Sequence, residues 1–89
     1  MKQFNDLQFV KLYDGVQAKT TYGEYELSVI QHSSSYGGTQ GLYEIAVFKG
    51  DGQIEMPGIT EDGQTVKGWL TEEDVSGIMK KMSYVSGPR

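Results

Sequence analysis

The chain has 89 residues and no cysteine, and its twelve Asp and Glu side chains outnumber its eight Lys and Arg side chains, giving a formal net charge of -4. A chain of this length forms one small domain, with room for a thin core and not for a deep catalytic cavity. The lack of cysteine excludes disulfides and cysteine zinc sites, and the acidic balance with a single arginine, Arg89, argues against direct nucleic-acid binding.

Residues 4–70 are rich in segments where apolar and polar side chains alternate with the period of β-strands, but the apolar residues of 7–13 fall on both parities and predict a strand of uncertain facing. The alternation is clearest in residues 24–32, where Tyr25, Leu27 and Val29 share one face of the predicted strand. A second clear strand, residues 42–49, places Tyr43, Ile45 and Val47 on one face. Altogether, strands are predicted at residues 7–13, 16–22, 24–32, 42–49, 53–56 and 65–70.

The period changes at Thr71, and residues 71–85 are predicted to form one amphipathic helix. Thr71 and Asp74 have the spacing of a capping box, in which each side chain accepts a hydrogen bond from the other residue's amide. Gly77 disfavours the helix by about 1 kcal/mol relative to Ala, so the helix either packs closely there or is marginally stable. The apolar face of the predicted helix consists of Val75, Ile78, Met79, Met82 and Val85.

These elements predict an α+β fold, in which an antiparallel sheet of about five strands carries the C-terminal helix on one face. The single domain is expected to span residues 1–89, with a strand-rich part (4–70), the helix (71–85) and a flexible tail (86–89). The N-terminus lacks the apolar run of a signal peptide, and no stretch approaches the apolar length of a membrane span. We therefore expect a cytoplasmic protein without a membrane partner.

Catalysis and metal binding have few suitable residues in this sequence. His32 is the single histidine, so no second imidazole or thiol can join it in a metal site. Serines follow it at 33–35, but no Gly-x-Ser-x-Gly motif is present to orient a nucleophile. The dense Asp and Asn spacing of a calcium loop is also absent. We expect a protein that is not an enzyme and that needs no metal and no cofactor.

The candidate binding site is the loop of residues 33–41, which interrupts the alternation between two good strands. Its hydroxyls, its amides and the ring of Tyr36 have the chemistry of a protein-binding loop, in which an aromatic side chain gives contact area at low entropic cost. They also suit a nucleotide site, because backbone amides cradle phosphate. A mobile hairpin tip is the third interpretation. The candidate partner- or ligand-binding residues are Ser34, Ser35, Tyr36, Gly37, Gly38, Thr39 and Gln40.

Trp69 precedes the predicted helix, between Gly68 and Leu70. Strand alternation places it on the same face as Lys67, at the margin of the domain. Two interpretations follow from this position: Trp69 fills the core beneath the helix, or it anchors an interface.

Four segments of the chain resemble a group of small uncharacterised proteins encoded by tailed bacteriophages. The likeness spans residues 25–82 and implies a setting, an accessory protein made inside an infected bacterium, with no catalytic residues to transfer. Short acidic phage proteins without cysteine are often counter-defence factors or inhibitors of host proteins. The segments that carry the resemblance are SYGG at 35–38, GLYEIAV at 41–47, GIT at 58–60 and GWLTEEDV at 68–75.

Two functional hypotheses follow. The first is a non-catalytic inhibitor of a host defence protein, an anti-CRISPR or similar counter-defence factor, whose acidic surface and Tyr36 loop cover a basic nucleic-acid-binding surface. The second is a homo-oligomeric sponge that sequesters a cyclic or modified nucleotide signal. The lack of arginine before residue 89 weighs against the second, although lysine and amides can bind phosphate.

Overall fold

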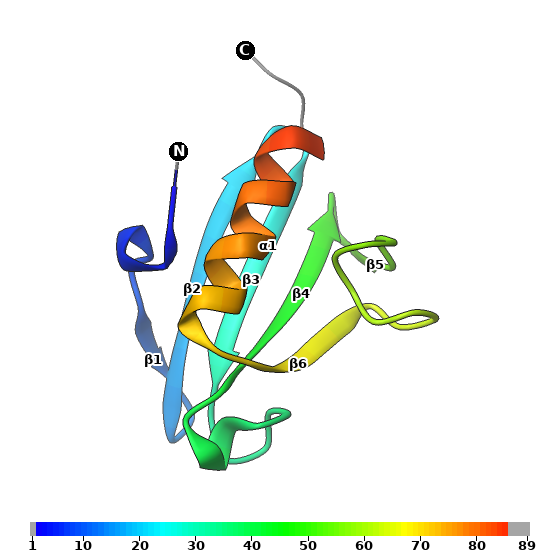
Figure 1. Cartoon of the computed structure of the whole chain (residues 1–89). Helices are drawn as coiled ribbons and strands as arrows, with labels where there is room; N and C mark the ends of the chain where they lie inside the picture. The colour runs from blue at the N-terminus through cyan, green and yellow to red at the C-terminus, as the bar shows by residue number, and fades with distance from the viewer. Residues whose placement is uncertain (1, 86–89) are drawn as a thin grey trace.

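The computed structural model of the protein describes residues 2–85 and has the predicted α+β architecture (Figure 1). One antiparallel sheet has the order β1-β2-β3-β4-β5. Strand β6 pairs with the same edge of β4 as β5 does, but with the first half of β4, whereas β5 pairs with the second half. Helix α1 lies across one face of this sheet. The elements are β1 (Val10–Leu12), β2 (Gly15–Tyr22), β3 (Tyr25–Gln31), β4 (Tyr43–Lys49), β5 (Gly52–Ile54), β6 (Val66–Leu70) and α1 (Glu72–Val85), with 3-10 turns at Phe4–Asp6 and Gly38–Gln40.

The core lies between the sheet and α1, on the strand faces that the alternation predicts. Leu27 pairs with Val47, and Val29 pairs with Ile45, so the four side chains form one apolar patch on the helix-facing side. All four are completely buried. The helix covers this patch with its own buried residues, Val75, Ile78, Met79 and Met82.

Helix α1 begins with the predicted capping box. The Thr71 amide donates to Asp74 Oδ2 at 3.0 Å, and the Asp74 amide donates to Thr71 Oγ1 at 3.0 Å. The predicted apolar face is wrong at its end, because Val85 is 49% exposed. Close packing at Gly77 is also excluded, since a Cβ added there would meet no atom within 4 Å. The predicted tail 86–89 lies outside the described residues.

The predicted first strand, residues 7–13, is wrong over most of its length. The strand is only β1, and the aromatic residues before it pack as a cluster at the end of the core. Phe4 lies 5.0 Å from Tyr43 and 5.6 Å from Phe9 between ring centroids. Phe9 packs in this cluster while Val10 and Tyr13 are exposed, so the apolar residues of 7–13 do not share one face of a strand.

The long connection from β5 to β6 contributes to the core as well. The predicted strand at 53–56 is wrong at its end, because β5 ends at Ile54, and Met56 and Ile59 bury their side chains at the edge of the sheet. Thr60 fixes this turn: its hydroxyl accepts from the Met56 amide at 2.9 Å and donates to the Met56 carbonyl at 3.2 Å. The connection therefore has a defined position beside β6.

Candidate functional site

The predicted binding loop is a compact turn held by its own hydrogen bonds. Ser35 Oγ accepts from the His32 amide and donates to the His32 carbonyl, both at 2.9 Å, so the serine is buried and fixes the turn. Gly38 is required by close approach, because a Cβ there would lie 1.9 Å from the His32 carbonyl oxygen. Among the other predicted site residues, Gly37 is buried and Gly38 is half-buried, while Ser34, Tyr36, Thr39 and Gln40 are exposed.

Most of the loop amides are engaged within the protein. The Ser33 amide donates to Asp14 Oδ1 at 3.1 Å and the Tyr36 amide to Glu44 Oε1 at 2.8 Å. The hydrogen bonds from Ser33 lower the pKa of Asp14 below its ordinary value. The amides of Ser35, Gly38, Gln40, Gly41 and Leu42 donate to loop carbonyls. Two carboxylates occupy the position where a phosphate cradle needs free donors, so this geometry does not favour an anion site.

His32 serves the same turn. Its Nδ1 accepts from the Ser34 amide at 3.1 Å, and its ring lies edge-on to Tyr13 with centroids 5.4 Å apart. The imidazole thus accepts a hydrogen bond from a backbone amide. The nearby Ser35 hydroxyl is hydrogen-bonded to the His32 backbone. Within residues 2–85, no three His, Asp or Glu side chains gather as metal ligands do.

The loop meets β6 through two Gly and aromatic pairs that pack reciprocally. A Cβ on Gly68 would lie 2.3 Å from Tyr36 Cβ, and a Cβ on Gly37 would lie 3.2 Å from Trp69 Cε3. The Trp69 amide also donates to the Tyr36 carbonyl at 3.2 Å. Tyr36 therefore packs against Gly68, the neighbour of Trp69, and Trp69 packs against Gly37, the neighbour of Tyr36. Only glycine fits at positions 37 and 68, because a Cβ at either would be too close to the other segment.

A β-bulge explains where Trp69 points. Tyr43 pairs with Leu70 and Ile45 with Lys67, so Gly68 and Trp69 together oppose a single residue of β4. Trp69 has φ 60°, in the left-handed region, and its side chain is 59% exposed. The interpretation of Trp69 as a core residue beneath the helix is wrong, because the extra residue of the bulge breaks the alternation and turns the indole outward.

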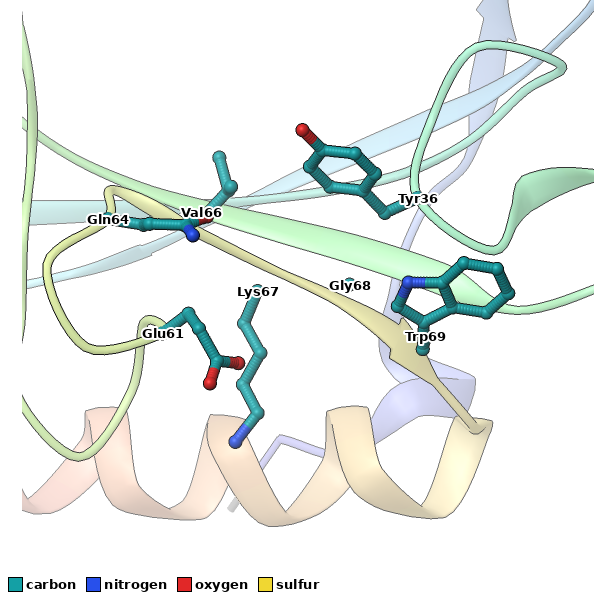
Figure 2. Close-up of a pocket in the computed structure, with 7 residues that line it drawn as sticks. All are labelled: Tyr36, Glu61, Gln64, Val66, Lys67, Gly68 and Trp69. Carbon is teal, nitrogen blue, oxygen red and sulfur yellow. The ribbon is translucent and has the colours of Figure 1, made fainter.

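Tyr36 and Trp69 flank a shallow pocket of about 240 Å³ at the outer edge of β6 (Figure 2). Glu61 reaches the same pocket from the preceding connection, and its amide donates to the Val66 carbonyl at 2.9 Å, which fixes this connection against β6. In Figure 2, the Lys67 side chain runs toward the helix, away from Tyr36. We call this region the Tyr36–Trp69 surface, comprising Tyr36, Glu61, Gln64, Val66, Lys67, Gly68 and Trp69.

Charged side chains of both signs border the Tyr36–Trp69 surface. A second pocket adjoins it and adds Glu73 and Asp74 from the first turn of α1, together with Lys81 from a later turn. Hydrogen bonds from Thr71 lower the pKa of Asp74, and the positive charge of Lys67 lowers it further. Within residues 2–85, one ion pair is present, between Lys49 and Glu24 at 3.7 Å, so Glu61 and Glu73 have no ion-pair partner in the described chain.

Sequence reasoning identified Tyr36 as a site residue but missed Gly68, Glu61 and the joining of the loop to β6. The one signal in the sequence is the repeated pairing of glycine with an aromatic residue, Tyr36-Gly37 and Gly68-Trp69, and it does not reveal that the two pairs meet.

Comparison of the chain with family models, curated proteins and solved structures gives no match. Within the described residues, no helix has the length and apolar character needed to cross a membrane.

Proposed function

We propose that the chain is a non-catalytic binding protein that docks on a basic surface of a partner protein through its Tyr36–Trp69 surface. The observation that carries this proposal is the exposure of two aromatic side chains, 55% for Tyr36 and 59% for Trp69, on a hydrogen-bonded frame. Tyr and Trp dominate the binding energy of protein interfaces. A frame fixed before binding reduces the entropy lost on association.

The backbone of Trp69 supports the same proposal. A residue other than glycine at φ 60° is strained, by about 1 kcal/mol, and such strain is concentrated at functional sites. Glycine would relieve the strain at this bulge and leave the pocket without its indole wall. A tryptophan whose side chain faces solvent at a strained position contributes little to the core, so its use lies in contact with a partner.

The partner's charge is inferred from the rim. The three carboxylates of Glu61, Glu73 and Asp74 outnumber the two lysines, Lys67 and Lys81, in the pockets beside the two aromatic rings, so this rim carries a net negative charge. A complementary basic surface would be steered toward it and held in register. In the setting implied by the phage resemblance, the partner is a bacterial defence protein with a nucleic-acid-binding groove, which the chain covers in the host cytoplasm. The loop geometry gives less support to the nucleotide sponge, because its amides are already engaged.

The test is capture of a partner from bacteria by the tagged chain and by three variants. Tyr36→Ala and Trp69→Ala should lose the captured protein, whereas Tyr84→Ala should retain it. Tyr84 is a matched control, an exposed tyrosine at the far end of α1. Tyr36→Ala keeps the Cβ that contacts Gly68 and the carbonyl that accepts from Trp69, so its melting temperature should stay close to wild type.

Retention of the same partner by both aromatic variants would contradict the proposal. So would native mass spectrometry that finds no protein partner but a defined oligomer carrying a nucleotide-sized adduct, which is the outcome the sponge hypothesis predicts.

A further inference from the structure

The pocket between Tyr36 and Trp69 has features that select one chemical group. The rings of Tyr36 and Trp69 and the backbone at Gly68 line it, and the Glu61 carboxylate lines its helix side, next to the Lys67 side chain (Figure 2). No protein cation occupies the space in front of the rings among residues 2–85, because the cation contacts to aromatic rings in that range are Lys2 on Tyr22 and Lys49 on Tyr25.

We infer that this pocket is a binding site for a guanidinium group, supplied by an arginine side chain of the partner protein. A guanidinium is planar and weakly hydrated, so it stacks on aromatic faces, and its fork of N–H donors matches a carboxylate. A lysine ammonium has the charge but neither the plane nor the fork. The inference rests on the proposed function, since it names the side chain by which the partner would be recognised.

Glu61 is the carboxylate that we expect to bind the guanidinium, because its backbone is fixed at the pocket. The hydrogen bond from the Glu61 amide to the Val66 carbonyl holds the connection against β6, and the Gln64 amide closes the turn by donating to the Glu61 carbonyl at 2.9 Å. Glu61 is exposed and forms no ion pair with a described residue. Its carboxylate therefore has no ion pair with a described residue to lose when a cation arrives.

Lys67 provides the sharpest test, because it lines the same pocket with the opposite charge. By its pairing with Ile45 it belongs to the helix-facing side of β6, and it acts electrostatically on Asp74. Its ammonium nevertheless repels an arriving guanidinium and attracts an arriving phosphate. Removal of this charge should strengthen binding of arginine and weaken binding of a nucleotide, so the sign of the effect identifies the ligand class.

The assay uses the fluorescence of Trp69, the single tryptophan of the chain. The full chain is titrated with N-acetyl-arginine amide, with the lysine amide, with the neutral isostere N-acetyl-citrulline amide, and with AMP. The arginine amide should change the emission saturably in the millimolar range, and the citrulline amide should not. Glu61→Gln should weaken arginine binding by about threefold to fivefold, and Lys67→Met should strengthen it by a similar factor. Glu24→Gln, which removes the carboxylate paired with Lys49, is the control and should have no effect.

An equal response to the arginine and citrulline amides would overturn the inference, because recognition would not depend on the charge. A response to AMP that Lys67→Met weakens would replace it with a nucleotide site. If the arginine amide gives no response while partner capture still depends on Tyr36 and Trp69, the guanidinium inference fails and the proposed function stands. If capture also survives both aromatic substitutions, both fail.

Discussion

The contact between Gly68 and Tyr36 can be tested by adding one methyl group, in the variant Gly68→Ala. The new Cβ would lie 2.3 Å from Tyr36 Cβ and 3.1 Å from the Tyr36 carbonyl oxygen. Two carbon atoms in contact are separated by about 3.5 to 4.0 Å, so the loop and β6 must move apart by more than about 1 Å. This movement would break the 3.2 Å hydrogen bond from the Trp69 amide to the Tyr36 carbonyl.

The expected loss of stability follows from three contributions. Overpacking costs about 1 to 3 kcal/mol, and one lost hydrogen bond costs about 0.5 to 1.5 kcal/mol. Replacing glycine by alanine restricts the unfolded chain and returns about 0.4 to 1 kcal/mol. The net loss is about 0.5 to 4 kcal/mol, which for a domain of this size lowers the melting temperature by about 2 to 30 °C.

The assay for Gly68→Ala is thermal denaturation followed by circular dichroism, together with the native emission spectrum of Trp69. Displacement of the loop uncovers the indole face that packs on Gly37, so the emission should shift to longer wavelength. A melting temperature at or above that of wild type with an unchanged spectrum would refute the reciprocal packing of the two Gly and aromatic pairs.

Three further predictions test the rest of the fold. Gly77→Ala, the same substitution in open space within α1, should raise stability by up to about 1 kcal/mol in urea denaturation, and a loss would show that the glycine is needed. Ile45→Ala removes a completely buried side chain and should cost about 2 to 5 kcal/mol, so near-wild-type melting would contradict the facing of β4. For Asp74, the folded-state pKa lies below the ordinary value of 3.8, so its contribution is present above that value and lost as the pH falls through the folded pKa. Asp74→Asn should therefore be less stable than wild type in urea at pH 7, and the difference should shrink at pH 3; a difference independent of pH would exclude a role for the ionised carboxylate.

Much of the fold follows from local patterns in the sequence. The alternation around Leu27 and Ile45 gives both strand faces, because successive side chains of a strand point to opposite sides and only one side has a helix to cover it. The capping box at Thr71 and Asp74 depends only on residues three positions apart, so the start of α1 could be predicted closely. The pattern fails for residues 7–13, because Phe9 packs on Tyr43 of the distant strand β4.

The Tyr36–Trp69 surface is a product of tertiary structure. Sequence by itself determined that Tyr36 lies in a glycine-rich loop and that Trp69 lies beside a helix start, since both follow from local turn and capping chemistry. Only the folded chain decided that the loop meets β6, that the bulge turns the indole outward and that Glu61 joins them. The physical reason is that a bulge shifts the strand register by one residue, and that the residue packed against Gly68 at this bulge is Tyr36, which is distant in the sequence.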